Sequence, residues 1–234
     1  MQKKIIITQS NYIPWKGYFD GINTADLFVV YDEMQFTRRD WRNRNIIKTA
    51  QGPKWLTIPV DVKGKYLQKI SETRISDSSW NQQHWQTIQD AYGKTPFFKQ
   101  YKDFFADLYN SATSEWLHEV NVHFLHGICD LLGIKTEFAD SASFTLAEDR
   151  NERLLNIAKE LEATDYYSGP AAKAYMNTDF FTEAGINVHF FDNSGYPEYP
   201  QLFPPFEHAV SILDLIFNTG PEVWNFMKTG KIHA

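Results

Sequence analysis

Two clusters of polar and aromatic residues near the start of the chain have the side chains that binding of a small activated substrate requires. One cluster directly follows the apolar run 5–7, and the other follows the apolar run 27–30. Aromatic rings can stack on a planar base or a sugar face, and arginine or lysine can hold a phosphate group. The predicted substrate-binding residues of the two clusters are Gln9, Asn11, Tyr12, Trp15 and Tyr18, and then Gln35, Arg38, Trp41, Asn43, Arg44 and Lys48.

The charged residues of the second cluster indicate specific roles. Arg38, Arg44 and Lys48 belong to a cationic patch on an acidic chain, and we expect them to neutralise phosphate. Asp32 is the predicted catalytic residue here, because a carboxylate at this place can take a proton, hold a ribose hydroxyl or orient a cation. A structural ion pair between Asp32 and Arg44 is the alternative. Asn43, between two arginines, is expected to orient a ligand oxygen.

Three residues outside these clusters complete the predicted site. His84 and Tyr92 lie eight residues apart, near one stripe of a predicted helix. His84 is the second predicted catalytic residue, with core packing or capping as its alternative role, and Tyr92 is expected to bind substrate. Ser168 lies at a predicted strand end before Gly169, where it can donate to a ligand oxygen, although ordinary turn chemistry explains it as well.

The loop after the first apolar run has its own backbone signals. Pro14 restricts Ile13 to an extended conformation, and Gly17 permits close approach of a neighbouring segment. The aromatics of this loop, Tyr12, Trp15, Tyr18 and Phe19, are predicted to form a stacking wall for a planar base or a sugar face. The alternative is that they fasten the first helix to the sheet.

The elements that must position these residues alternate between strands and helices. Strands are predicted at 4–8, 27–31, 55–60, 136–138 and 188–191, and helices at about 17–24, 79–92, 97–112, 114–132, 149–161 and 208–218. This order favours an α/β fold with a largely parallel sheet flanked by helices. Residues 1–234 are expected to form a single domain with a helical subdomain, an insertion or cap, at about 79–132. The segment 195–206 is predicted to be a long irregular loop.

The composition of the chain indicates its cell compartment and the kinds of binding partner to expect. The chain has 234 residues, a net charge of −6 and one cysteine, which together predict a cytoplasmic protein without an internal disulfide. No apolar stretch reaches the roughly 20 residues that membrane insertion needs. The acidic balance argues against nucleic acid as a partner. A small anionic or nucleotide-linked substrate is expected instead, and homo-oligomerisation stays open.

Several familiar signatures are missing from the sequence. It contains no glycine-rich phosphate fingerprint and no serine nucleophile elbow. His118, His123 and His126 share a predicted helix, but their spacing does not place all three on one face, so no metal site is predicted. Cys129 lies in an apolar run and is expected to pack as a small hydrophobe. The sequence predicts no particular cofactor.

The sequence as a whole resembles the WbqC-like protein family. The matching pieces are TQSNYIPWKGYF, the segment 25–36, WRNRN at 41–45, the pair His84 and Tyr92, YYSG at 166–169, and VSILDLIFNTG at 210–220. Ser10 departs from the family pattern, which has proline there. The resemblance implies a bacterial cytoplasmic protein whose relatives are encoded among genes for surface polysaccharide such as O antigen.

A second resemblance concerns the fold. The opening order of strand, loop and helix is similar to the start of pantothenate synthetase and related nucleotidyltransferase-like folds, which implies a three-layer core of that kind. Those proteins carry an HxGH motif in the first loop, whereas this chain has Pro14 to Tyr18 there. The likeness therefore does not extend to adenylyl transfer by paired histidines.

The residues and the family resemblance together predict a transferase. We expect it to act on a nucleotide-linked sugar or a similar small activated substrate in surface polysaccharide biosynthesis, by positioning phosphate beside a proton-transferring group. One alternative is a nucleotidyltransferase-like enzyme that uses ATP or CTP. Another is a non-catalytic binding or assembly factor of the same pathway.

Overall fold

A parallel sheet forms the centre of the fold. The computed structural model describes residues 2–230, and its main sheet has the strand order β5-β2-β1-β6-β7. All of the pairings in this sheet are parallel. The prediction of an α/β fold with a largely parallel sheet is confirmed. The strands are β1 (Lys4–Thr8), β2 (Leu27–Val30), β5 (Glu137–Asp140), β6 (Asp165–Ser168) and β7 (Asn187–Phe190).

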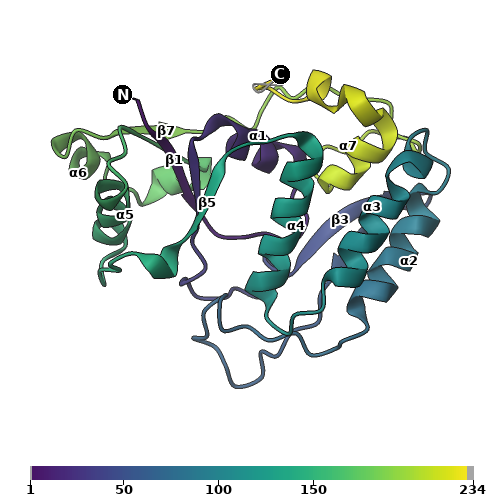
Figure 1. Ribbon diagram of the computed structural model, residues 1–234, viewed down its shortest axis with the longest axis horizontal. Helices are drawn as coiled ribbons and strands as arrows, with labels where there is room; N and C mark the ends of the chain where they lie inside the picture. The colour runs from purple at the N-terminus through teal and green to yellow at the C-terminus, as the bar shows by residue number, and fades with distance from the viewer. Residues whose placement is uncertain (1, 231–234) are drawn as a thin grey trace.

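Successive side chains of each strand point to opposite faces of the sheet, and both faces are apolar. Ile6 and Phe28 pack into the larger core with α1 (Lys16–Thr24) and α4 (Leu117–Leu132). Ile5, Val29 and Tyr31 pack into a second core with α5 (Arg150–Glu160) and α6 (Thr178–Glu183). Successive strand residues point to opposite faces, so the sheet lies between two layers of helices, as Figure 1 shows.

The ends of two helices follow the capping rules. Asp149 accepts hydrogen bonds from the backbone N–H groups of Asn151 and Glu152 and begins α5. Gly133 ends α4 with a φ of +74°, a conformation that glycine adopts without a Cβ penalty. Both positions were predicted from the sequence. Cys129, in the last turn of α4, is buried as expected.

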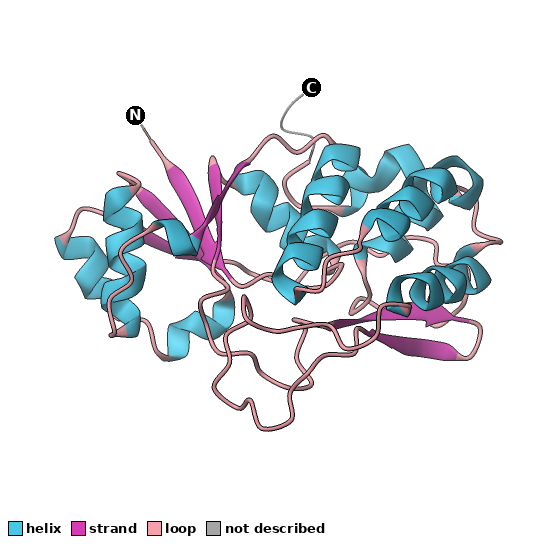
Figure 2. Cartoon of the chain, turned by 60° about the horizontal axis from the view of Figure 1, so that its bottom comes forward, coloured by secondary structure: helices cyan, strands magenta, loops and turns pink. Residues whose placement is uncertain are grey.

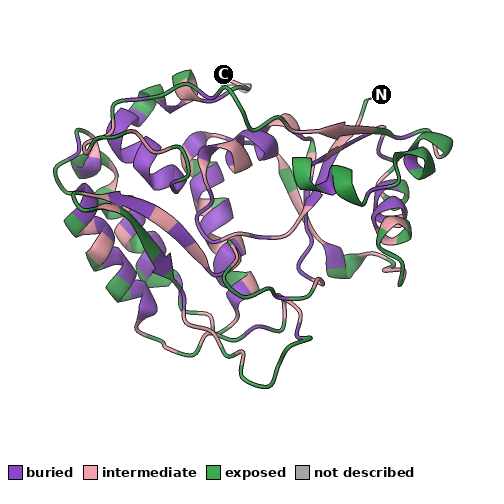
Figure 3. Ribbon diagram, turned by 180° about the vertical axis from the view of Figure 1, so that it is seen from behind, coloured by how far each residue is buried: buried purple, intermediate pink, exposed green. Residues whose placement is uncertain are grey.

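A second group of elements lies beside the sheet. It contains α2 (Trp80–Tyr92), α3 (Phe98–Ser111), α7 (Ile212–Thr219) and an antiparallel hairpin of β3 (Arg44–Thr49) and β4 (Gly52–Thr57). Figure 2 shows this hairpin apart from the main sheet. β3 is largely covered and β4 largely exposed (Figure 3). The predicted strand at 55–60 is therefore wrong in its bounds and in its sheet, and β3 was not predicted.

The remaining segments are short or irregular. Within residues 2–230, the short 3-10 helices η1 (Ser141–Ser143) and η2 (Pro170–Ala174) lie between longer elements, and η3 (Gly220–Phe226) follows α7. The segment 195–206 has no regular secondary structure, as predicted. Among residues 2–230, no helix combines the length and apolar character that crossing a membrane demands.

Candidate functional site

The strand order fixes where a ligand site is expected. From β1 the chain proceeds to β2 and β5 on one side, whereas β6 and β7 lie on the other. The loops that follow β1 and β6 therefore run in opposite directions from the carboxyl edge of the sheet, which makes the gap between these two strands a topological switch point. In open α/β sheets, ligands usually bind in the crevice at such a point. A cavity of about 350 Å³ opens at this place. We call it the sheet-edge cavity, and its lining comprises Ile7, Thr8, Gln9, Tyr31, Met34, Arg42, Arg150, Leu154, Tyr166, Ser168, Gly169, Ala171, Ala172 and Tyr175.

Arg42 is the most constrained charged residue of the sheet-edge cavity. Its Nη1 donates to the side-chain oxygen of Asn11 and to the backbone oxygens of Gln9 and Ser10. Asp40 lies 3.6 Å from its Nη2. The Nε of Arg42 is buried and has no partner among the described residues. Arg42 thus holds the loop after β1 and keeps one donor free.

The opposite wall of the sheet-edge cavity carries a second guanidinium. Arg150, in the first turn of α5, lies over the ring of Tyr175 at 4.5 Å. The hydroxyl of Tyr31 is buried and finds no partner among the described residues. Burial raises the pKa of Tyr31, and Arg153, both by its charge and as a neighbouring hydrogen-bond donor, lowers it by less, as does the charge of Arg150. Arg42 and Arg150 are thus the charged residues among the described lining of the cavity.

The parallel register places Asp32 beside the first loop. The offset of 22 residues that pairs Ile5 with Leu27 continues past both strand ends, so that Ser10 stands opposite Asp32. The backbone N–H of Ser10 donates to Asp32 Oδ1 at 2.8 Å, and its hydroxyl donates to Oδ2 at 2.5 Å. Asn121 of α4 donates to the Ser10 hydroxyl at 2.9 Å. Asp32 is fully enclosed and does not line the cavity, so it positions the loop that does.

His118 connects this network to the edge of the sheet. Its Nδ1 lies 2.7 Å from Asp32 Oδ2, and its Nε2 lies 3.1 Å from Asp140 Oδ2. Burial disfavours the charged imidazole, but the hydrogen bond and charge of Asp32, with the charges of Asp140 and Glu119, outweigh it and raise the pKa of His118. The partner of Asp32 is therefore His118, not Arg44 as the alternative interpretation held.

The His118 network predicts a pH-dependent stability. A histidine whose pKa is raised on folding contributes stability that is complete below its ordinary value of 6.5 and is lost as the pH rises through the folded value. We expect the free energy of unfolding of the wild type to fall more steeply than that of His118→Gln as the pH rises above the ordinary histidine value of 6.5. Urea denaturation across this range measures the difference, and parallel curves would contradict the assignment.

The first loop turns its tyrosine inward. Ile13 has a φ of +35°, so the prediction that Pro14 holds it extended is wrong. Ile13 is fully buried, and its backbone oxygen accepts a hydrogen bond from Asn45 at 2.9 Å, so tertiary contacts hold this conformation. Tyr12 is also fully buried, and its hydroxyl lies 2.9 Å from His84 Nδ1.

His84 lies in the core rather than at the sheet-edge cavity. Its Nε2 lies 3.2 Å from the backbone oxygen of Thr57, and burial lowers its pKa to about 4. The imidazole is therefore neutral at ordinary pH. Tyr92 is equally enclosed and accepts a hydrogen bond from the backbone N–H of Lys48 at 2.9 Å. The structure gives His84 and Tyr92 contacts with the protein interior and none with the cavity.

The predicted phosphate-binding residues do not converge. Arg38 is exposed and lies over the ring of Tyr66, 5.0 Å away. Arg44 lies over the indole of Trp55 at 4.0 Å. Lys48 is buried and donates to the backbone oxygen of Pro205.

Two predicted amide residues also lie outside the sheet-edge cavity. Asn43 is buried and donates to the backbone oxygen of Ile58 at 2.8 Å, and Gln35 donates to that of Tyr66 at 2.6 Å. Both amides therefore fix the backbone of neighbouring loops. Of the predicted residues, Gln9 and Ser168 do line the cavity.

Other predicted residues line neighbouring hollows. Asn11, Trp15 and Trp41 line a separate cavity on the far side of the first loop. Tyr18 and Trp15 line a small pocket of about 110 Å³ on the α1 face of the sheet, and Tyr18 donates to the backbone oxygen of Gln9 at 2.7 Å. Among the described residues, no three His, Cys, Asp or Glu side chains are grouped to share a metal ion.

The sequence analysis missed several residues of the site. Arg42 belongs to the cationic patch, but nothing in the sequence distinguishes it from Arg38 or Arg44. Arg150 carries no local signal, because it reaches the site only through the packing of α5 on the sheet. His118 was considered only for a shared metal site. Its carboxylate partners could have been anticipated, since Asp32 and Asp140 follow or end neighbouring strands.

Comparisons with known proteins find relatives over nearly the whole chain. The sequence pattern of the WbqC-like protein family matches residues 9–225. The chain is similar to the uncharacterized protein Rv1507c of Mycobacterium tuberculosis, with 46% identity over 226 residues that cover 97% of this chain and 98% of that protein. No solved structure matches, so the likeness to nucleotidyltransferase-like folds stays a prediction.

Proposed function

Because the chain belongs to the WbqC-like protein family, we propose that it is a group-transfer enzyme of bacterial surface polysaccharide biosynthesis, such as that of O antigen. Its substrate is a nucleotide-linked sugar or a similar small activated compound. The site of the reaction is the sheet-edge cavity, and its compartment is the cytoplasm. The observation that carries the proposal is a cavity at the switch point of the sheet whose described lining contains two arginines and no carboxylate.

The charges of the sheet-edge cavity favour a phosphate-bearing ligand. Arg42 and Arg150 line it, and no Asp or Glu is among its described lining residues. Guanidinium groups bind phosphate with paired hydrogen bonds. Tyr31 and Ser168 also line the cavity and carry hydroxyl groups. A diphosphate fits this combination of charge and hydrogen-bond donors.

The transfer follows from such a binding mode. A lone pair of the acceptor forms a bond to the transferred group, while the bond from that group to the phosphate oxygen breaks and its electron pair stays on the phosphate. The departing phosphate takes up the acceptor's proton, since no carboxylate or histidine is among the described residues that line the cavity. Arg42 and Arg150 stabilise the negative charge that develops on the leaving phosphate.

Asp32 supports this step without touching the substrate. Through Ser10 it fixes the loop that carries Gln9 into the sheet-edge cavity. His118 and Asn121 hold Asp32 and Ser10 in turn. Asp32 is thus a positioning residue, and we assign no step to the buried His84.

A second candidate is a non-catalytic binding factor of the same pathway. It is favoured by one observation, namely that the cavity lining contains no side chain with an ordinary pKa near neutrality. Both candidates bind the same ligand, and turnover separates them. Release of free nucleoside diphosphate from a nucleotide sugar indicates transfer, release of pyrophosphate from ATP or CTP indicates nucleotidyl transfer, and binding without release indicates a binding factor.

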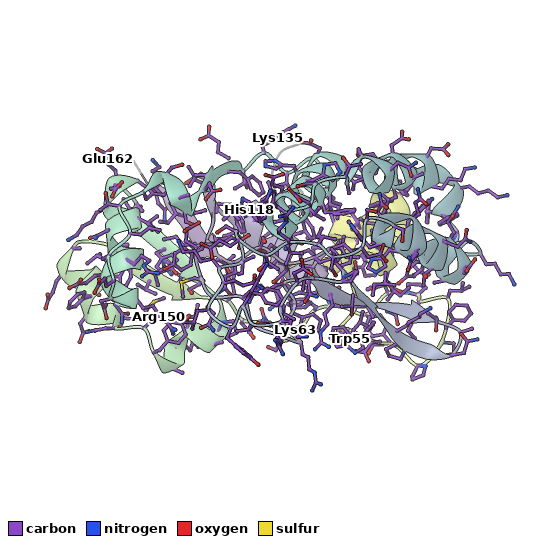
Figure 4. The ribbon with its side chains drawn as sticks, turned by 90° about the horizontal axis from the view of Figure 1, so that it is seen from below. Trp55, Lys63, His118, Lys135, Arg150 and Glu162 are labelled. Atoms are coloured by element: carbon purple, nitrogen blue, oxygen red, sulfur yellow. The ribbon has the colours of Figure 1, made fainter. Side chains whose placement is uncertain are left out.

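Thermal unfolding in the presence of nucleotide sugars tests the proposal. We expect UDP-, GDP- or dTDP-linked hexoses to raise the melting temperature of the wild type, because a ligand that binds only the folded state stabilises it. Arg150→Ala should weaken binding about tenfold, the lower range for a charged hydrogen bond. Lys135→Ala removes one positive charge on the opposite side of the molecule (Figure 4) and serves as the control.

Two outcomes would overturn the proposal. One is that none of these compounds stabilises the wild type. The other is that Arg150→Ala and Lys135→Ala bind the ligand equally well, because the charge at the cavity would then have no part in recognition.

A further inference from the structure

A second cavity lies on the other side of the loop that follows β1. It has a volume of about 280 Å³ and walls from three segments: the first loop, the start of the β3 hairpin and the segment before α7. Asn11 and Trp15 come from the first segment, Trp41 and Asn45 from the second, and His208 from the third. We call it the tryptophan cavity.

The tryptophan cavity has an exposed indole surface. Trp41, which lines the cavity, is 40% exposed, whereas Trp80 in the core is only 3% exposed. Trp55 is 42% exposed and lies beside Trp41, outside the lining. The rings of Trp41 and Trp55 lie 5.2 Å apart, and Arg44 packs over Trp55. Large aromatic rings that a fold leaves accessible at a cavity often mark a ligand surface. The apolar face of a pyranose ring is a natural partner for such a surface, because its C–H bonds meet the negative face of the aromatic ring.

The charge of the tryptophan cavity differs from that of the sheet-edge cavity. Its described lining contains no Lys, Arg, Asp or Glu. A charged ligand would lose hydration there without an ionic partner in the lining itself, because Arg42 and Arg44 contact Asn11 and Trp55 and are not among the lining residues. A neutral polyhydroxyl compound has no such cost, and the amide of Asn11 and the imidazole of His208 are polar groups that can bind its hydroxyls.

The two cavities share a wall. Arg42 lines the sheet-edge cavity and donates to the side-chain oxygen of Asn11, which lines the tryptophan cavity. The consecutive residues Trp41 and Arg42 line different cavities: Trp41 lines the tryptophan cavity, and Arg42 lines the sheet-edge cavity. The backbone N–H of Tyr12 donates to the oxygen of Trp41 at 3.1 Å, which ties this wall to the first loop. Ligands in the two cavities would therefore approach each other at Asn11 and Arg42.

We infer that the tryptophan cavity binds a neutral saccharide, the acceptor for the group whose activated donor occupies the sheet-edge cavity. This inference rests on the proposed function, since that function supplies the donor. It assigns the two substrates by charge: the phosphate-bearing one lies against the arginines and the neutral one against the indoles.

Saturation-transfer difference NMR tests the assignment with defined probes. The probes are the methyl glycosides of glucose, mannose, rhamnose and N-acetylglucosamine at millimolar concentration, with UDP as a separate anionic probe. We expect at least one glycoside to give a saturation-transfer signal with the wild type and to lose it with Trp41→Ala. Trp41→Phe, which keeps a flat ring, should retain part of the signal. Tyr66→Ala, which removes a 70% exposed ring outside both cavities, should retain all of it.

The UDP probe separates failure of this inference from failure of the proposed function. Suppose that UDP binds and that its binding depends on Arg150. If no glycoside then binds, or if a glycoside binds equally well to the wild type and to Trp41→Ala, the saccharide assignment is overturned and the proposed donor site stands. If no glycoside binds and none of the UDP-, GDP- or dTDP-linked hexoses stabilises the wild type, both are overturned. Circular dichroism of Trp41→Ala and UDP binding by that variant show that a lost signal does not come from unfolding.

Discussion

Replacing Asp32 by alanine is expected to lower the free energy of unfolding by about 3–5 kcal/mol, the range for breaking a buried charged pair. The carboxylate is 1% exposed and accepts hydrogen bonds from Ser10 at 2.8 and 2.5 Å, with His118 at 2.7 Å. Its removal leaves the Ser10 groups without their acceptor and a histidine without its principal anion. Urea denaturation of purified protein measures the loss.

The chain contains a matched control for this substitution. Asp26 accepts a hydrogen bond from the backbone N–H of Lys4 at 2.8 Å, at the opposite end of the same strand pair and with the same offset of 22 residues. That contact is exposed, so Asp26→Ala should cost about 1 kcal/mol or less. Equal losses for the two variants would show that the buried network around Asp32 adds nothing to stability.

A conservative change at Asp32 tests its coupling to His118. Asp32→Asn keeps the size of the side chain but removes the negative charge that helps to raise the pKa of His118. In this variant we expect the pKa of His118, followed by NMR titration, to be lower than in the wild type. An unchanged pKa would show that Asp140, which lies 3.1 Å from the other ring nitrogen, and not Asp32, raises the pKa of His118.

Replacing Arg42 by alanine is expected to weaken nucleotide-diphosphate binding about hundredfold, the effect of losing two or more charged hydrogen bonds. Arg42 serves the sheet-edge cavity twice, because it supplies positive charge and its Nη1 holds the oxygens of Gln9 and Ser10. Asn121 also donates to the backbone oxygen of Arg42 at 2.9 Å, so the backbone stays anchored when the side chain is removed. Calorimetric titration with UDP or a UDP-linked sugar measures the loss.

Two further variants show which property of Arg42 matters. Arg42→Lys keeps the charge but lacks the planar set of donors that contacts the loop, and we expect it to recover little of the affinity. Arg38→Ala removes a guanidinium of the same cationic patch that lies outside the cavity, against Val62 and Tyr66. If Arg38→Ala weakens nucleotide-diphosphate binding more than Arg42→Ala does, the phosphate site lies at the exposed part of the cationic patch and not in the sheet-edge cavity.

The sequence was sufficient for the main elements of the sheet and for several helix ends. β1 and β2 are short apolar runs, and the polar residues after them mark the carboxyl edge where parallel strands meet. Asp149 and Gly133 act within a few residues of their own positions in the chain, so local rules predict them. Periodicity and capping depend on neighbours in sequence, which is why they can be recognised without coordinates.

The hairpin of β3 and β4 shows where local patterns fail. β3 reads RNIIKT and alternates only weakly, and its partner strand is mostly exposed. The hairpin is defined by the way Ile47 and Leu56 pack into the larger core beside α2 and α7. These contacts join segments far apart in the chain, and no short stretch of sequence encodes them.

By itself the sequence determined the family and the parallel α/β sheet, and it predicted that ligand-binding residues follow the first two strands. Only the tertiary structure decided which of those side chains face a cavity. Tyr12 turns into the core, and Arg42 rather than Arg38 or Arg44 meets Arg150 across the sheet edge. The physical reason is that a residue's type limits what its side chain can bind, whereas its direction beyond a strand end depends on backbone angles and packing that distant segments impose.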